Sequence, residues 1–166
     1  MVKLVCSSCQ QCYSENDPRW QCDCGGLLDI QFTPEFDADK MQHRPFTMWR
    51  YREAIPVLHD SNIVSFYEGF TPLIDIDMDG LTVKVKMDHL FPSGSFKDRG
   101  ASVLISKVKE LGVHHVVEDS SGNAGAAIAA YCARARIECD IYVSSFASPE
   151  KLRHIESMGA RVHRVP

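Results

Sequence analysis

The sequence contains no run of about 18 to 20 apolar residues, the length that a membrane-spanning helix needs. Its first residues, from Met1 to Cys6, lack the apolar core of a secretory signal peptide. Internal repeats and low-complexity segments are also missing. We therefore expect a cytoplasmic protein that has no membrane partner.

Positive charge is in short supply as well, because 18 Lys and Arg residues stand against 22 Asp and Glu residues. The deficit falls in the first 40 residues, which carry three basic and seven acidic side chains, while the rest of the chain is balanced. Nucleic-acid binding depends mainly on neutralising phosphates, and an acidic segment is unsuited to it. We expect no nucleic-acid partner.

Cysteine, by contrast, is abundant and clustered, since five of the seven cysteines precede residue 25. Cys6 and Cys9 form one close pair, and Cys22 and Cys24 form a second. Two such pairs can surround a structural Zn²⁺ with four thiolates, whereas an odd number of cysteines cannot all pair as disulfides. Cys12 could replace one ligand, but we interpret it as a spare thiol. Buried small residues are the alternative interpretation, and they do not explain two tight pairs.

The remaining pattern divides the chain into three parts. We predict a zinc ribbon over residues 1–32, whose minimal core would be packed by Tyr13, Trp20, Leu27 and Ile30. Isolated aromatics and prolines without periodicity predict an irregular connecting arm over residues 33–80. From residue 81 to residue 166, strand and helix patterns alternate, which predicts an α/β domain. Its expected form is a three-layer parallel sheet with helices on both faces.

The individual elements of this domain follow from apolar periodicity and from glycine stops. Strands are expected at 81–87, 113–117, 139–143 and 161–165. Helices are expected from about residue 97 to Gly112, over 123–135 and over 149–158.

Two polar, glycine-containing loops, residues 91–100 and 119–125, precede helices at the sheet edge where ligands collect in such folds. Free N–H groups and the helix dipole favour a bound anion there. At the start of one helix, Lys97 is placed where the dipole keeps more of an amine neutral, the form that bonds to aldehydes. A solvated surface lysine and a plain turn with a helix cap are the alternative interpretations.

The two loops closely resemble those of threonine synthase, a pyridoxal 5'-phosphate enzyme family with the tryptophan-synthase-beta fold. The resemblance rests on Ser93-Gly94-Ser95-Phe96-Lys97-Asp98-Arg99-Gly100 and on Ser120-Ser121-Gly122-Asn123-Ala124-Gly125. It covers nearly the whole chain and includes the cysteine ribbon, the segment Glu68-Gly69-Phe70-Thr71-Pro72-Leu73 and the Gly159-Ala160 turn.

The resemblance implies a role for each matching residue. Lys97 would be the lysine that binds the cofactor covalently and acts as general base, and Asn123 would contact the ring hydroxyl of the cofactor. The loop that binds the α-carboxylate of the substrate would consist of Ser120, Ser121, Gly122, Asn123 and Ala124. The implied enzyme is a carbon-oxygen lyase of threonine biosynthesis, a homodimer when full length, that converts O-phosphohomoserine and water to threonine and phosphate.

The chain also departs from the pattern of that family. It has Phe91-Pro92-Ser93 where Asn-Pro-Thr is usual, and Asp88 where Glu is usual, so the edge of the substrate pocket is altered. It ends before the glycine-rich loop that holds the cofactor phosphate, so we expect the N-terminal portion of a longer protein, inactive alone. The alternatives are a related pyridoxal enzyme, such as a cysteate synthase or a dehydratase, and a non-catalytic zinc-binding fragment.

Overall fold

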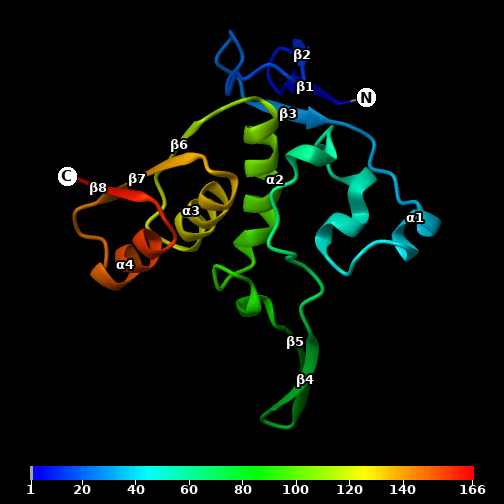
Figure 1. Ribbon diagram of the computed structural model, residues 1–166, viewed down its shortest axis with the longest axis vertical. Coiled ribbons are helices and arrows are strands. Elements are labelled where there is room, and N and C mark those ends of the chain that lie inside the picture. Colours follow the sequence, from blue (N-terminus) through cyan, green and yellow to red (C-terminus); the bar gives the residue numbers. More distant parts are fainter. Residues whose placement is uncertain (1) are drawn as a thin grey trace.

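The computed structural model describes residues 2–166 and begins with a small antiparallel sheet (Figure 1). The central strand of this sheet is β1 (Lys3–Cys6), which pairs with β2 (Cys12–Ser14) and with β3 (Leu28–Gln31). Three of the four side chains expected to form its core are exposed instead, namely Trp20, Leu27 and Ile30. The expectation of an apolar core is wrong here, because strands of three or four residues bury too little surface.

The connecting arm is irregular over most of its length, with the short helix α1 (Ala38–Gln42) and the 3-10 helices η1 (Met48–Ala54) and η2 (Asp60–Asn62). A pair of hydrogen bonds from Arg44 to the carboxylate of Glu53, 2.6 and 2.7 Å long, ties one part of the arm to another. These bonds from Arg44 hold the pKa of Glu53 at about 2. The arm is therefore ordered by side-chain pairs more than by backbone ladders.

A β-hairpin projects from the body of the molecule, with strands β4 (Leu73–Met78) and β5 (Leu81–Lys86) (Figure 1). Its two-residue loop is Asp79-Gly80, and both residues have positive φ, 54° and 79°. Such a turn matches the twist of paired strands, and glycine accepts the left-handed conformation without strain. The strand predicted at 81–87 is present, but it pairs with β4 and takes no part in the parallel sheet.

The rest of the chain alternates between helix and strand, as the sequence predicts, and each boundary lies within two residues of the expected one. The elements are the 3-10 helix η3 (Asp88–Leu90), α2 (Lys97–Glu110), β6 (His115–Glu118), α3 (Asn123–Ala135), β7 (Glu138–Ser144), α4 (Pro149–Ser157) and β8 (Arg161–Val165). None of the helices that the structure describes is both long and apolar enough to cross a membrane.

The three strands β6, β7 and β8 form a parallel sheet in sequential order. Right-handed crossovers that step in one direction place both connecting helices on the same face. Ile141 and Val143 are buried on the face that α3 and α4 cover, whereas Val117 is 61% exposed on the other. Within residues 2–166 the expectation of helices on both faces is therefore wrong.

The uncovered face of this sheet carries a cluster of charged side chains centred on Asp140. Arg161 Nε lies 2.8 Å from its carboxylate, and the Nε2 atoms of His115 and His163 lie 2.5 and 2.7 Å away. Hydrogen bonds from Arg161 and His163 lower the pKa of Asp140 well below its usual range. These contacts satisfy the hydrogen-bonding capacity of the Asp140 side chain, which is only 6% exposed although no helix covers this face.

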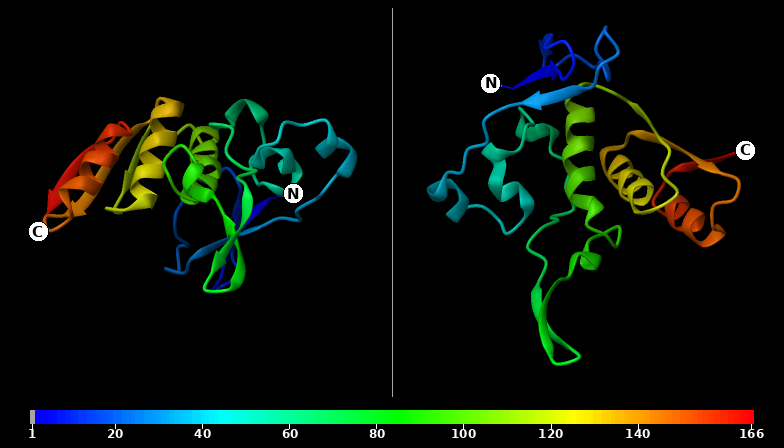
Figure 2. Two further views of the ribbon diagram at one scale, coloured as in Figure 1. Left: turned by 90° about the horizontal axis from the view of Figure 1, so that it is seen from below. Right: turned by 180° about the vertical axis from the view of Figure 1, so that it is seen from behind.

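Helix α2 lies between the arm on one side and the parallel sheet on the other, an arrangement that Figure 2 shows again from behind. Helix α3 packs between α2 and the sheet, and it is buried around its circumference from Gly125 to Cys132. Half of these residues are alanines, whose small side chains let the neighbouring elements approach closely.

A buried carboxylate, that of Glu68, joins the arm to both of these helices. Its side chain is 2% exposed. Five groups donate to it: the Trp49 indole, the Ser65 hydroxyl, the Phe66 N–H, the Ser102 hydroxyl and the Tyr131 hydroxyl. Burial and the adjoining carboxylate raise the pKa of Tyr131 well above its usual range, so this phenol stays a donor at neutral pH.

Replacing Glu68 with alanine removes the common acceptor of these five donors and leaves buried polar groups without partners. We expect Glu68→Ala to lower the free energy of unfolding by about 3 kcal/mol or more, measured by urea denaturation. Glu156→Ala, which truncates an exposed glutamate of α4, serves as the matched control and is expected to cost less than about 0.5 kcal/mol. Equal effects of the two changes would contradict a central role for Glu68.

Candidate functional site

The lysine singled out in the sequence, Lys97, is the first residue of α2, and its side chain is exposed. Its backbone N–H donates to Ser95 Oγ over 3.3 Å, and its Nζ lies 5.2 Å from the centre of the Phe96 ring. No carboxylate of residues 2–166 forms an ion pair with it. The amine is thus free to react with a ligand that reaches this end of the helix.

The turn before Lys97 is fixed by Asp98, which is fully buried beneath it. The backbone N–H of Ser93 donates to Asp98 Oδ2 over 3.0 Å, and the Ser93 hydroxyl donates to Oδ1. Burial raises the pKa of Asp98, against the effect of these two bonds. Sequence reasoning did not single out Asp98 as the residue that positions Lys97, because only its contact with Ser93 reveals this role.

The second loop, residues 119–122, leads directly into α3, which begins at Asn123. Inside the loop, the Gly122 N–H donates to Ser120 Oγ over 3.2 Å. The N–H groups of residues 123–125 have no acceptor among residues 2–166 and lie at the positive end of the helix. This arrangement suits the binding of a carboxylate or another small anion.

Gly125 is required by the close approach of this loop to α3. A Cβ atom built on Gly125 would collide with the carbonyl oxygen of Ser120 and would lie 3.3 Å from Ile155 Cδ1. Only a residue without a side chain fits this position.

Helix α4 shows that the two loops are neighbours. His154 Nε2 lies 3.3 Å from the carbonyl oxygen of Ser93 in the first loop, and Ile155 faces Gly125 after the second. Burial and the Asp119 carboxylate raise the pKa of Glu118, and the Lys97 ammonium opposes that rise. The structure therefore brings Lys97 and the loop that contains Ser120, Ser121, Gly122, Asn123 and Ala124 to one region of the surface.

The two departures from the family pattern lie beside this region. Phe91 is 5% exposed, and the Arg99 guanidinium lies 4.7 Å from the centre of its ring. Thr71 and Arg99 donate to Asp88 Oδ1 over 2.5 and 3.1 Å. Burial would raise the pKa of Asp88, but these hydrogen bonds hold it below its usual value. Both residues thus act on Arg99, whose orientation they fix.

The four paired cysteines converge in the N-terminal sheet, as the sequence predicts. Their Sγ atoms all lie within 4.8 Å of one another, and the distances Cys6 to Cys24 and Cys9 to Cys22 are both 3.6 Å. Four sulfurs bound to one Zn²⁺ lie about 3.8 Å apart, given a Zn–S bond of about 2.3 Å. The geometry of the cluster fits that ion.

Other residues around the cluster match this interpretation. A Cβ atom on Gly26 would lie 2.6 Å from Cys6 Sγ, so the backbone passes directly beneath the sulfurs. The Tyr13 hydroxyl lies 3.0 Å from Cys22 Sγ, and its hydrogen bond lowers the pKa of that thiol to about 6. Cys12 lies outside the group and donates to the carbonyl oxygen of Gln10.

Comparison with known proteins agrees with the resemblance inferred from the motifs over most of the chain. The family model described as pyridoxal-phosphate dependent enzyme matches residues 64–166. The threonine synthase of Methanocaldococcus jannaschii is 35% identical over 96% of this chain and 42% of its own length, and that of Methanosarcina acetivorans is 36% identical over 82% and 36%. The chain spans less than half the length of these relatives. The resemblance to threonine synthase inferred from the motifs is confirmed.

Solved structures support the fold as well. A hydrogen sulfide-producing enzyme from Fusobacterium nucleatum aligns with a TM-score of 0.53 and 28% sequence identity, over 63% of this chain and 36% of its own.

The contact at Gly125 yields a test of the second loop. Gly125→Ala should displace the loop from α3 and lower the free energy of unfolding by about 1 to 3 kcal/mol, measured by urea denaturation. The matched control is Gly100→Ala, because Gly100 lies within α2 and a Cβ atom there would meet nothing within 4 Å. This control is expected to stabilise the protein by about 0.5 to 1 kcal/mol. A Gly125→Ala protein as stable as the unchanged protein would show that the loop does not need the close approach.

Proposed function

Because the chain belongs to the family of pyridoxal-phosphate-dependent enzymes, we propose that it forms part of a threonine synthase-like lyase. The proposed reaction converts O-phosphohomoserine and water to threonine and phosphate. The observation that carries the proposal is the exposed Lys97 amine at the start of α2, beside a loop with three free N–H groups. Since the aligned part of the first relative is 42% of its length, the reaction is that of the whole protein, and we expect little turnover from these residues alone.

The residues present fit the cofactor at two points. Lys97 Nζ would bind its aldehyde covalently, and the Asn123 side chain, exposed at the first position of α3, would contact its ring hydroxyl. When bound, the pyridoxal group supplies an electron sink for negative charge at the α-carbon of the substrate.

The protein itself would bind, orient and exchange protons. The N–H groups that follow Gly122 would hold the α-carboxylate of the substrate, which fixes its orientation relative to Lys97. Lys97 Nζ, when not bonded to the cofactor, would accept and return protons at the substrate carbons. Asp98 would keep this amine in place, because it anchors the turn from which α2 begins.

A related enzyme of the same family acting on another amino acid, such as a cysteate synthase or a dehydratase, is the second candidate. The observation that favours it is the pair Asp88 and Phe91, which together set the position of Arg99 at the edge of the site. Turnover of a panel of amino-acid substrates by the full-length protein would distinguish the two candidates.

Lys97 can be tested directly in the full-length protein. Borohydride reduction followed by peptide mapping should place a pyridoxyl label on Lys97, and Lys97→Ala should abolish both the label and the visible absorbance of the bound cofactor. Asn123→Ala should keep the label while shifting the absorbance, because it removes only a hydrogen bond. Lys151→Ala, at an exposed position of α4, is the control and should change neither. A label on Lys107, Lys109 or any lysine other than Lys97 would refute the assignment.

We also propose that Cys6, Cys9, Cys22 and Cys24 hold one structural Zn²⁺. The support is the convergence of the four sulfurs in a sheet whose large apolar side chains are mostly exposed. A metal would supply the cross-link that such a small sheet needs.

Metal analysis of the purified chain should give about one Zn²⁺ per chain. Cys22→Ser should release the metal and loosen the N-terminal sheet, whereas the matched change Cys12→Ser should retain it, because Cys12 lies outside the cluster. Full zinc content in Cys22→Ser would contradict the proposed ligand set.

A further inference from the structure

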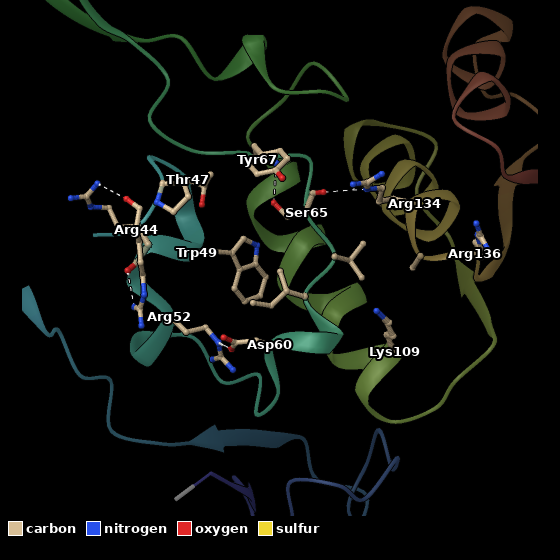
Figure 3. A pocket seen from close by; sticks show the side chains of 15 residues that line it. Arg44, Thr47, Trp49, Arg52, Asp60, Ser65, Tyr67, Lys109, Arg134 and Arg136 are labelled. Carbon is tan, nitrogen blue, oxygen red and sulfur yellow. Dashed lines mark hydrogen bonds and ion pairs between the residues drawn. The ribbon is translucent and has the colours of Figure 1, made fainter. Parts of the chain in front are cut away.

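A cavity of about 700 Å³ lies between the connecting arm and the C-terminal ends of α2 and α3 (Figure 3). Neither of the loops at the candidate site contributes to its lining. Lys109, which lines it, follows Lys97 by 12 residues, or about 18 Å along the axis of α2. The cavity is therefore distinct from the region that contains Lys97.

Positive charge is concentrated around this cavity. Six of the 18 Lys and Arg residues of the chain line it, although the chain as a whole carries a net charge of −4. Asp60 is the one acidic residue in the lining. The cationic residues are Arg44, Arg50, Arg52, Lys109, Arg134 and Arg136.

Only two of these six cations are neutralised by ion pairs. Arg44 pairs with Glu53, and Arg52 Nε lies 2.5 Å from Asp60 Oδ1. The other four have no carboxylate within 4.0 Å among residues 2–166. The cavity thus keeps several uncompensated positive charges, which favours a bound anion.

Three of the unpaired cations are held in place by backbone carbonyl groups. Lys109 Nζ donates to Ser61 O over 2.8 Å, Arg134 Nε donates to Ser65 O over 3.3 Å, and the third, Arg50, donates to the carbonyl of Arg44. A carbonyl fixes the direction of the side chain without cancelling its charge. The remaining N–H groups of Lys109 and Arg134 have no acceptor among residues 2–166 and can donate to a ligand with several acceptor oxygens. The Arg50 guanidinium also lies over the rings of Phe46 and Phe70, 4.5 and 5.6 Å from their centres.

Helix dipoles explain the position of only some of the six cationic residues that line the cavity. Lys109, Arg134 and Arg136 lie at the C-terminal ends of α2 and α3, where the negative end of a helix favours cations. The other three come from the arm, where no long helix ends. Three separate segments of the chain, the arm and the ends of α2 and α3, therefore supply positive charge to one cavity.

We propose that this cavity binds a small organic phosphate with at least two negative charges. Phosphate oxygens match the forked donors of arginine, and the volume lies within the range of small-molecule sites. The hydroxyl groups of Thr47 and Tyr67 add polar contacts, while Trp49 and Ile63 provide an apolar surface for the uncharged part of the ligand. The proposal does not depend on the reaction assigned to Lys97.

Trp49 gives a direct readout of binding, because it lines the cavity and the only other tryptophan, Trp20, lies in the N-terminal sheet region. In a Trp20→Phe background, titration of the 166-residue chain with inorganic pyrophosphate at constant ionic strength should change the Trp49 fluorescence saturably below about 10 mM. Isothermal calorimetry on the unchanged chain should give the same dissociation constant. Sodium chloride at equal ionic strength should have no such effect.

The double variant Lys109→Gln, Arg136→Asn should weaken pyrophosphate binding at least about tenfold, since it removes two of the cations. Asn accepts the left-handed backbone conformation of Arg136, where φ is 59°. The control, Lys151→Gln, Arg164→Gln, removes the same charge from exposed positions outside the cavity and should bind within about twofold of the unchanged chain. Circular dichroism verifies that both variants fold. If the variant Lys109→Gln, Arg136→Asn does not fold, Arg50→Gln, which changes the arm, replaces it. No saturable binding, or equal weakening in the control, would overturn the proposal.

Discussion

The hydrogen bonds accepted by the buried carboxylate of Glu68 are the interaction on which the arrangement of the molecule depends. A charge removed from water is tolerated only when it is fully hydrogen-bonded, and here its donors come from two places in the arm, Trp49 and the segment around Ser65, and from α2 and α3. Each donor must keep its position for the carboxylate to remain satisfied. The side chain therefore fixes Trp49, Ser102 and Tyr131 relative to one another, and with them the elements to which they belong.

The relation between α2 and α3 determines where the candidate site and the basic cavity lie. Their N-terminal ends carry Lys97 and Asn123, and α4 contacts the loops that precede both. Their C-terminal ends, with Lys109 and Arg134, line the basic cavity against the arm. Free N–H groups thus lie at the start of α3, and cations lie at the C-terminal ends of both helices, which is the distribution that helix dipoles favour. Anion binding at the second end relies on side-chain charge supplied in addition by the arm.

The N-terminal sheet is stabilised by a different principle. Its strands are too short to bury a core, and the backbone instead passes closely beneath four sulfur atoms, where Gly26 leaves room for Cys6. The rest of the molecule relies on apolar packing, with Ile105, Ile141 and Ile155 fully buried around the alanine-rich face of α3. A conventional core therefore stabilises one part of the chain, and the other part is the one for which we propose a metal cross-link.

The sequence by itself determined the elements whose signals are local. Apolar periodicity and glycine stops predicted α2, α3 and α4 to within two residues, and cysteine spacing predicted which four sulfurs converge. Contacts between distant residues were decided only by the tertiary structure: the pairing of β4 with β5, the placement of α3 and α4 on one sheet face, the support of Lys97 by Asp98, and the basic cavity. Periodicity shows which face of a helix or strand is apolar, but it does not show which other element packs against that face. That choice depends on how the elements are connected in space and on contacts between distant residues, such as Glu68 and Tyr131, which are 63 positions apart.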